Sequence, residues 1–433
     1  MKVLVVGSGG REHALAWAIH KSPGVEKVWI APGNPGTKAC GVNVPIDPMD
    51  FEAIYDLCRN EAIDLVVVGP ENPLAAGIAD FLMDRGIRVF GPTSAGARLE
   101  ASKSAAKDFM ARHGIPHARY KAFEQVEDAV SYFRSVPGPW VIKADGLAYG
   151  KGVTIVSDMD EAKKAIGEML SGKLHGEAGR RIVIEEFLEG TEATAMALCD
   201  GNTIFPLPMA KDHKRVFEGD KGPMTGGMGV FSPLPFVTPE LEDAICRDIL
   251  YKTLMGLKTD GIDYRGVIYA GLMLTEDGPK VLEYNVRFGD PEAQCVLPRL
   301  TGDFAGALLA CAEGRLESFV EGKGIGVRDE AAVTVVMTSQ GYPGDYPKGL
   351  PIAGLERFAD GIGPGDVSPD VLVFQAGTKL DHEGRLVTSG GRVLAVTALM
   401  PALDAARSKA YEAVSQISFA GAYYRKDIGE VNA

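Results

Sequence analysis

The chain of 433 residues is 46% hydrophobic and 24% charged, a composition typical of globular proteins. Its length predicts about two to four domains, because a single hydrophobic core rarely organises so many residues. The formal net charge of −13 argues against proteins that depend on long-range attraction to nucleic acid or to an anionic membrane. A phosphate site in this chain must therefore be built from local positive groups.

The six cysteines are scattered, without the paired spacing of a zinc site or a disulfide framework. Such a pattern is typical of a reducing compartment. The first apolar run is too short for a signal peptide, and no apolar run reaches the roughly 18 residues of a membrane span. We expect a cytoplasmic protein that binds neither nucleic acid nor a membrane.

The first hundred residues alternate short apolar runs with helical patterns. The apolar runs lie at 2–6, 27–31, 64–69 and 87–91, and the helical patterns extend to residue 20 and over about 50–60 and 73–85. Continuous apolar strands between helices predict a parallel sheet covered on both faces. We expect residues 1–101 to form a doubly wound α/β domain.

The rest of the chain divides at a helix and at a Gly/Lys-rich joint. Residues 102–113 predict a helix with a Ser102 cap and a stop at Gly114. A smaller α/β unit follows at about 120–190, and strands and helices alternate as far as the joint at 321–326. We expect a domain at 102–325, with 120–190 as its small lobe, and a mixed α/β domain at 326–433.

Residues 144–156, "ADGLAYGKGVTIV", place a lysine-bearing glycine loop between two short apolar runs. A P-loop needs four residues between its glycines and then Lys-Ser/Thr, whose hydroxyl holds magnesium. Only three residues separate Gly146 and Gly150, and Gly152 stands where the hydroxyl would be. The segment is therefore not a P-loop.

A second glycine turn, "GSGGREHA" at 7–14, joins the first strand to a helix. Backbone N–H groups at such a turn bind anions. Glu12 stands where a dinucleotide fingerprint needs its third glycine, and the second strand does not end in an acidic residue, which disfavours a nicotinamide cofactor. The turn either packs strand against helix or binds a phosphate or sugar together with the loops at 33–37 and 69–74.

The stretch 278–294, "GPKVLEYNVRFGDPEAQ", has the alternation of an extended strand. One predicted face is apolar (Leu282, Tyr284, Val286, Phe288) and the other is polar (Glu283, Asn285, Arg287). The polar face is either a solvated surface or a hard-cation site for magnesium on a polyphosphate. The following turn is expected to place Arg287 and Asp290 in a loop.

Two further segments carry weaker signals. The charged run at 211–215, which continues into "GPMTGGMG", is either exposed surface or mobile backbone that closes over a ligand. The apolar run at 181–188 meets acidic residues and a glycine, as many edge strands do. The order of these signals along the chain is more informative than each one alone.

In that order, Lys103, Lys143, the glycine loop, the 181–195 strand and the Glu283/Asn285 pair resemble the ATP-grasp ligases. The chain resembles more closely the phosphoribosylamine–glycine ligase family, from "GSGGREHA" to "YYRKDIG" at 423–429. The signature "RFGDPEAQ" at 287–294 is present without a departure, and "DHKR", "GPMTGGMG" and "TSGGRVLAVTA" also fit.

The resemblance implies a two-lobed ATP-grasp core that binds ATP between its lobes, with a glycine loop over the phosphates. Lys103 and Lys143 would hold phosphates, and Glu283 and Asn285 would ligate Mg²⁺ or Mn²⁺. The strand before them, residues 269–275, has no further carboxylate. The remaining ATP-binding residues implied by the resemblance are Gly146, Gly150, Lys151 and Gly152 of the loop, Glu185, Phe187 and Leu188 for adenine, and Glu192 for the ribose.

The resemblance also implies the reaction: glycine and 5-phosphoribosylamine are joined through glycyl phosphate, with release of ADP and phosphate, in de novo purine biosynthesis. Gly9, Gly10 and Glu71 would contact phosphoribosylamine, and Arg392 its phosphate. The expected catalytic residues are Asp212, Arg287 and Asp290, with Asp212 and Arg287 at the glycine end. We expect a monomer without a covalent enzyme intermediate.

Two other functions compete with this interpretation. Another ATP-grasp ligase, such as a carboxylase component, would share the lysines, the loop and the metal strand but not "RFGDPEAQ" with "TSGGRV". A nucleotide-binding oxidoreductase or regulatory module is disfavoured by Glu12 and by the second strand. A non-enzymatic scaffold would not need several polar sites at strand ends.

Overall fold

The computed structural model describes residues 1–135, 138–147, 152–172, 179–362 and 370–431. The N-terminal domain contains a five-stranded sheet in which every neighbouring pair is parallel. In spatial order its strands are β3 (Val42–Asn43), β2 (Lys27–Pro32), β1 (Lys2–Gly7), β4 (Leu65–Val68) and β5 (Val89–Phe90). This arrangement confirms the predicted parallel sheet.

Both faces of this sheet are covered, because successive residues of β1 enter different apolar clusters. Leu4 and Val6 belong to one cluster, and Val3 and Val5 to the other. The helices of the domain are α1 (Gly10–His20), α2 (Phe51–Glu61), α3 (Glu71–Ala75) and α4 (Ile78–Met83). The helix predicted at 73–85 is thus two helices, because Gly77 lies between them with a positive φ of 88°.

Two helices lead into the central domain. They are α5 (Ser94–Ala101) and α6 (Lys103–Arg112). Ser102 caps α6 as predicted, since its hydroxyl accepts a hydrogen bond from the backbone N–H of Ala105 at 3.2 Å. None of the helices in the described ranges has the length and apolar character that a bilayer crossing requires.

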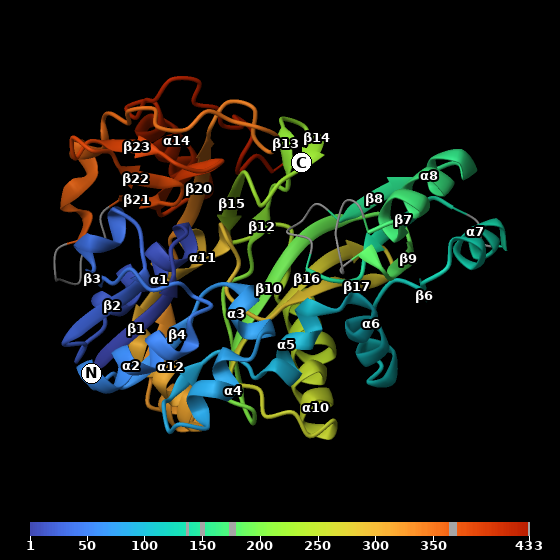
Figure 1. Ribbon diagram of the computed structural model, residues 1–433, viewed down its shortest axis with the longest axis horizontal. Helices are drawn as coiled ribbons and strands as arrows, with labels where there is room; N and C mark the ends of the chain where they lie inside the picture. Colours follow the sequence, from blue (N-terminus) through green and yellow to red (C-terminus); the bar gives the residue numbers. More distant parts are fainter. Residues whose placement is uncertain (136–137, 148–151, 173–178, 363–369, 432–433) are drawn as a thin grey trace.

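The small lobe has its own sheet and its own core, and it stands at the right of Figure 1, away from the N-terminal domain. Its elements are β6 (Tyr120–Phe123), α7 (Val126–Ser135), β7 (Trp140–Ala144), β8 (Val153–Val156), α8 (Met159–Leu170) and β9 (Ile182–Glu186). The strands pair antiparallel in the order β6-β9-β7-β8. The lysine-bearing glycine segment of residues 144–156 therefore joins two antiparallel neighbours, β7 and β8.

The large lobe has an antiparallel sheet in the order β11-β10-β16-β17. These strands are β10 (Thr191–Cys199), β11 (Ile204–Pro206), β16 (Gly266–Thr275) and β17 (Gly278–Asn285). A helical segment packs against the sheet and consists of α9 (Pro239–Ile245), the π-helical turn η3 (Cys246–Tyr251) and α10 (Lys252–Thr259). Strand β17, which carries the predicted metal ligands, is the edge strand.

A bulge in β17 changes the predicted alternation. Glu283 pairs with Gly271, whereas Val281 pairs with the next residue, Leu272, so that Leu282 is the extra residue. Leu282 does not belong to the buried apolar face; Val281 takes that place, and Leu282 lines a cavity next to Glu283. The assignment of Leu282 to the apolar face was therefore wrong.

The segment 211–229, which begins with the charged run expected to be exposed surface or mobile backbone, contributes strands to the C-terminal sheet. It forms β12 (Lys211–Asp212), the hairpin strands β13 (Arg215–Phe217) and β14 (Lys221–Met224), and the start of β15 (Gly229–Ser232). The sheet order is β12-β15-β20-β24-β21, completed by β20 (Ala331–Thr338), β24 (Arg392–Met400) and β21 (Val371–Gln375). The central and C-terminal parts of the chain therefore share one sheet.

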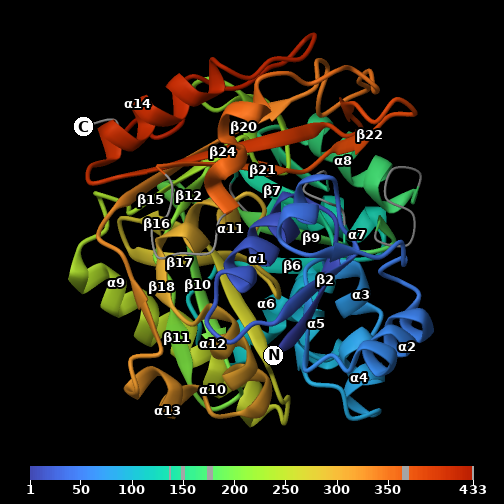
Figure 2. The same cartoon turned by 90° about the vertical axis from the view of Figure 1, so that its left-hand side faces the viewer.

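The C-terminal sheet rests on the N-terminal domain, and Figure 2 shows β21 and β24 above α1 and α11. The ring of Phe374 on β21 meets His13 and Trp17 of α1 edge to face, at centroid distances of 5.5 and 6.0 Å. The remaining elements are η1 (Gly36–Ala39), α11 (Glu292–Val296), η4 (Leu297–Arg299), β18 (Leu300–Gly302), α12 (Phe304–Glu313), α13 (Leu316–Glu321), β19 (Ile325–Val327), η5 (Leu355–Ile362), β22 (Thr378–Leu380), β23 (Leu386–Thr388) and α14 (Leu403–Val414).

Because the small lobe has a separate core, a substitution that creates a cavity in this core should lower the stability of that lobe alone. Ile142 on β7 is fully buried in this core. Ile142→Ala should cost about 2–4 kcal/mol and raise amide hydrogen exchange in β6–β9. In the matched control Ile30→Ala, faster exchange should instead appear in the N-terminal sheet. Exchange that rises equally in all domains after Ile142→Ala would contradict an independent lobe.

Candidate active site

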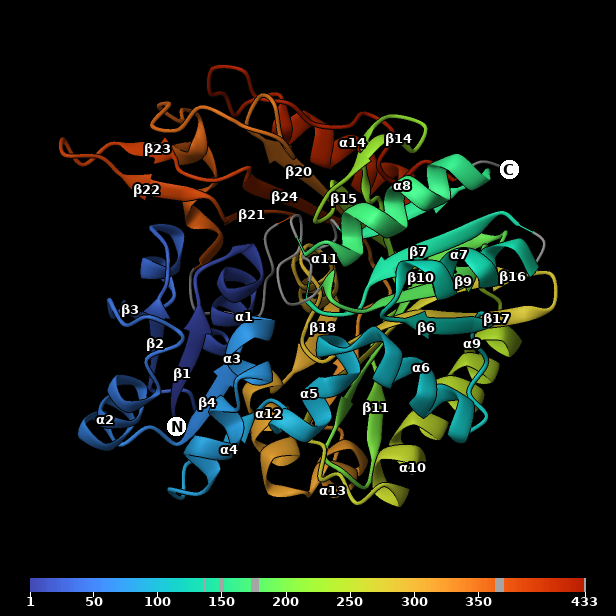
Figure 3. The ribbon, with the colours of Figure 1, turned by 45° about the vertical axis from the view of Figure 1, so that its right-hand side comes forward.

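A cavity of about 1480 Å³ opens where the small lobe, the large lobe and the C-terminal domain meet. Figure 3 shows these parts around the centre of the molecule, with the N-terminal domain on the left. The cavity is lined by the following predicted site residues: Glu71, Lys103, Lys143, Gly152, Glu185, Phe187, Leu188, Glu192, Asp212, Glu283, Asn285, Arg287, Asp290 and Arg392. Gly150 and Lys151 lie outside the described residues.

The small-lobe wall is organised around the buried carboxylate of Glu185 on β9. The ammonium group of Lys143 lies 3.1 Å from its Oε1, and that of Lys107 lies 2.9 Å from its Oε2. Burial opposes ionisation of Glu185, but the two lysines outweigh it and lower the pKa of this carboxyl group. Lys107 was missed by the sequence analysis, although it lies one helical turn after Lys103 on α6.

Lys103, at the start of α6, faces the glycine loop. Its Nζ donates a hydrogen bond to the carbonyl oxygen of Gly146 at 3.0 Å. Asp145 holds the loop to the helix, since its Oδ1 accepts from the backbone N–H of Ser104 at 2.6 Å. Burial lowers the pKa of the Lys103 amine. Two of the predicted phosphate ligands, Lys103 and Lys143, thus enter one cavity from two different elements.

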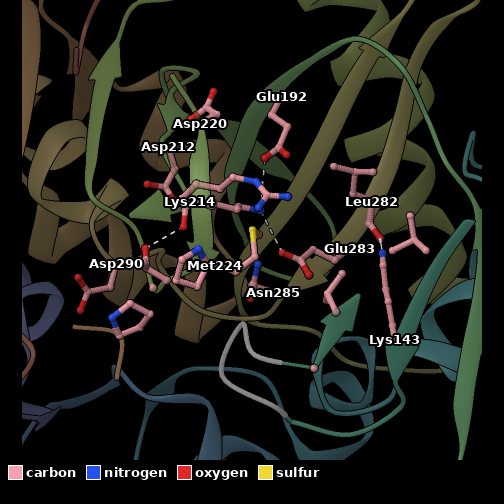
Figure 4. Close-up of a pocket in the computed structure, with 18 of the residues that line it drawn as sticks. Lys143, Glu192, Asp212, Lys214, Asp220, Met224, Leu282, Glu283, Asn285 and Asp290 are labelled. Atoms are coloured by element: carbon pink, nitrogen blue, oxygen red, sulfur yellow. Dashed lines mark hydrogen bonds and ion pairs between the residues drawn. The ribbon is translucent and has the colours of Figure 1, made fainter. Parts of the chain in front are cut away.

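The large-lobe wall carries Glu283 and Asn285 on β17. Lys214, which follows β12, extends its ammonium group to 3.3 Å from Glu283 Oε1 and 3.7 Å from Glu192 Oε2 (Figure 4). Lys214 is the largest influence on Glu283 and lowers its pKa to about 2. In the sequence Lys214 is one of several charged residues at 211–215, and only the fold brings it to β17.

The donor set at β17 fits a hard divalent cation. Glu283 offers a carboxylate and Asn285 an amide oxygen, and both line the cavity. In the described part of the chain, no group of three or more His, Cys, Asp or Glu residues has metal-binding geometry. Two protein ligands suit Mg²⁺ that takes its other ligands from nucleotide phosphates and water.

Arg287, just after β17, is held between two carboxylates. Its Nη2 lies 2.8 Å from Glu100 Oε1, and its Nε lies 3.3 Å from Glu71 Oε2. Burial alone would lower the pKa of Arg287, but Glu100 and Glu71 outweigh it and raise this pKa. Glu71 comes from the N-terminal domain, so this ion pair joins that domain to the end of β17. Glu100 was missed because its helix gave no functional signal.

Asp290 and Arg392 form a second cross-domain pair. Arg392 Nη2 lies 3.2 Å from Asp290 Oδ1, and Nη1 donates to the backbone oxygen of Asp290 at 2.6 Å. Burial opposes ionisation of Asp290, but Arg392 outweighs it and lowers the pKa of this carboxyl group. The turn after β17 is therefore fastened to the first residue of β24.

Asp212 lies beside a second carboxylate, Glu292, which was also missed. Burial and the negative charge of Glu292 raise the pKa of Asp212 well above its usual value. Gly227, with a positive φ of 115°, packs against Asp212; a Cβ atom there would come within 2.7 Å of Asp212 Oδ1. This close approach explains why a glycine-rich stretch follows the charged run.

The glycine turn before α1 lies at the rim of this region. The backbone N–H of Gly9 donates to Glu12 Oε2 at 2.6 Å, so Glu12 occupies the helix start where a dinucleotide fingerprint would accept pyrophosphate. Cβ atoms at Gly9 and Gly10 would meet Asp290 and Gln294, respectively. Both glycines are thus neighbours of the Asp290 turn.

The N-terminal, central and C-terminal parts of the chain each match a family model. Residues 1–100, 101–293 and 332–431 match the models for the N domain, the ATP-grasp (A) domain and the C domain of phosphoribosylglycinamide synthetase. A phosphoribosylamine–glycine ligase of Rhizobium meliloti (strain 1021) is 48% identical over 99% of this chain and 98% of its own length. A trifunctional purine biosynthetic protein adenosine-3 of Gallus gallus is 50% identical over 99% of this chain, which spans 42% of that protein.

Solved structures also resemble this chain over nearly its full length. A phosphoribosylamine–glycine ligase of Thermotoga maritima superposes with a TM-score of 0.82 at 37% identity, over 99% of this chain and 100% of that one. A biotin carboxylase of Campylobacter jejuni, at 14% identity, shares the fold with a TM-score of 0.70 over 99% of this chain and 94% of its own. The full-length matches, together with the cavity between the lobes, show that the chain belongs to the phosphoribosylglycinamide synthetase family.

Proposed function

We propose that this chain ligates glycine to 5-phosphoribosylamine and converts ATP to ADP and phosphate, as a step of purine biosynthesis. The observation that carries this function is the full-length match to relatives named phosphoribosylamine–glycine ligase. The cavity supports it, because cations from the small lobe and oxygen ligands from β17 face the same space. The rival carboxylase function has support only from fold-level similarity at low identity.

ATP binds between the lobes in this proposal. Lys103 and Lys143 neutralise the phosphates, while Phe187 and Leu188 line the adenine end and Glu192 accepts from the ribose hydroxyls. Mg²⁺ or Mn²⁺ held by Glu283 and Asn285 would supply positive charge to the phosphates. Glu185 orients Lys143 and Lys107 so that the phosphate-binding lysines need little rearrangement.

The chemistry proceeds in two displacements. A carboxylate oxygen of glycine attacks the γ-phosphorus as its bond to ADP breaks, giving glycyl phosphate. The amine nitrogen of phosphoribosylamine then attacks the glycyl carbonyl carbon, and phosphate leaves. The first step brings together two anions, so the residues act mainly by alignment and charge neutralisation.

We assign the remaining residues to the two acceptor substrates. Asp212 and Arg287 lie at the glycine end, and Asp290 completes this catalytic group. Gly9, Gly10, Glu71 and Arg392 contact phosphoribosylamine; Arg392 leaves Asp290 to bind the phosphate of the sugar. We further propose a cytoplasmic monomer.

The function is tested by measuring ADP release with glycine and phosphoribosylamine together and with each omitted in turn. The expected result is ADP release that requires both substrates. Release with neither, or with another carboxylic acid in place of glycine, would overturn the function.

Glu283→Gln keeps the size of the side chain and removes its charge. We expect an unchanged fold and a turnover reduced about a hundredfold or more, the scale of losing a main electrostatic partner of the reacting groups. ADP release at saturating substrates measures this effect. The matched control is Glu276→Gln, in the β16–β17 turn, which should be near wild type; near-normal ADP release by Glu283→Gln would remove Glu283 from the site.

Arg392→Ala should raise the KM for phosphoribosylamine about tenfold or more, because one charge-assisted phosphate contact is lost. The KM for ATP should change little, since the nucleotide occupies the small-lobe side. Arg385→Ala, at an exposed turn, is the matched control. An unchanged KM for the sugar would show that its phosphate binds elsewhere.

A further inference from the structure

Lys214 forms ion pairs with Glu283 and Glu192, and the proposed mechanism requires both carboxylates to bind other groups. Its ammonium group lies 3.3 Å from Oε1 of Glu283, the proposed metal ligand, and 3.7 Å from Oε2 of Glu192, the proposed ribose ligand. In Figure 4 the Lys214 side chain reaches between these two carboxylates. Its side chain is 22% exposed and lines the cavity, so this cation stands within the nucleotide site.

The carboxylate of Glu283 cannot serve two cations equally well. An ammonium group and a divalent ion on the same carboxylate would lie within a few ångströms of each other and repel strongly in a partly buried site. Other cations of the cavity wall are paired elsewhere: Lys143 and Lys107 contact Glu185, and Arg287 contacts Glu71 and Glu100. Among the described residues of the cavity wall, Lys214 forms the ion pair with Glu283, the proposed metal ligand.

The protein also offers the metal few ligands of its own. Glu283 and Asn285 supply oxygen atoms, and within the described ranges no cluster of three His, Cys, Asp or Glu residues completes a metal site. Octahedral Mg²⁺ or Mn²⁺ must take its remaining ligands from phosphates and water. A metal that arrives alone would gain little from this site and would have to displace Lys214.

We propose that Lys214 is a competing cation that occupies Glu283 in the nucleotide-free protein and makes metal binding conditional on nucleotide. The triphosphate supplies the missing metal ligands and offers Lys214 a new anionic partner, so the divalent ion replaces the ammonium group on Glu283. The site then loads metal and nucleotide together and does not hold free metal. This inference rests on the proposed nucleotide-dependent function of the cavity.

The test measures the binding of Mn²⁺ alone, without nucleotide, by electron paramagnetic resonance of the free ion. Lys214→Met removes the ammonium group and keeps most of the apolar length of the side chain. It should bind Mn²⁺ roughly tenfold or more tightly than wild type, because the competing ion pair is gone. Lys214→Arg, which keeps the charge, should bind Mn²⁺ as weakly as wild type.

The matched control is Lys211→Met, on strand β12 three residues before Lys214 and also on the cavity wall. This substitution removes one positive charge from a lysine that does not pair with Glu283. The Mn²⁺ affinity of the variant should stay within about twofold of wild type. A gain in Lys211→Met as large as that in Lys214→Met would reduce the effect to net charge and overturn the proposal. Unchanged or weaker Mn²⁺ binding by Lys214→Met would also overturn it.

Two further measurements separate this proposal from folding and from the proposed function. Thermal unfolding of Lys214→Met should show a cooperative transition, and Mn²⁺ with ADP should bind to it. The double variant Lys214→Met/Glu283→Gln should lose the gain in Mn²⁺ affinity; if the gain persists, Mn²⁺ binds away from Glu283 and the proposal fails. If the wild-type protein releases no ADP in response to glycine, that result contradicts the proposed function and not the role of Lys214.

Discussion

The structure depends on the pairing of buried and half-buried cations at the cavity with carboxylates in an otherwise acidic protein. Lys143 and Lys107 share Glu185, Lys214 contacts Glu283, and Arg392 contacts Asp290. An unpaired charge in such a partly buried site would carry a large desolvation cost. Pairing allows a chain of net charge −13 to keep several positive groups on the wall of one cavity.

These pairs also join the parts of the molecule that must act together. Arg287 follows β17 and contacts Glu71 of the N-terminal domain, while Arg392 of the C-terminal sheet contacts Asp290 of the turn after that strand. Strands β12 and β15 add a hydrogen-bonded backbone link, because these central-domain strands belong to the C-terminal sheet. The cavity therefore forms at a junction whose walls are connected by charges and by backbone, which favours preorganisation over large rearrangement.

The sequence predicted the parallel N-terminal sheet, the capped helix α6, the separate small lobe and fourteen of the residues that line the cavity. The predictions from sequence were wrong or incomplete where a feature depends on residues that are distant in the chain. Strict alternation misplaced Leu282, because a bulge is a property of two paired strands and Leu272 and Val281 must both be seen to detect it. Lys107 and Glu100 were missed because the sequence around a charged residue does not show its burial or a distant partner, and Glu292 was missed although it lies in the signature at 287–294.

By itself, the sequence determined the order of elements and the chemical types available to the site. Neighbouring residues determine strand and helix periodicity, caps and glycine turns, so these features can be predicted from the sequence. Only the tertiary structure decided which cation meets which carboxylate. Lys214 and Glu283 are far apart in the chain, and their contact arises because β12 joins the C-terminal sheet while β17 ends at the edge of another. Ion pairing depends on distance in space, which sequence separation does not specify.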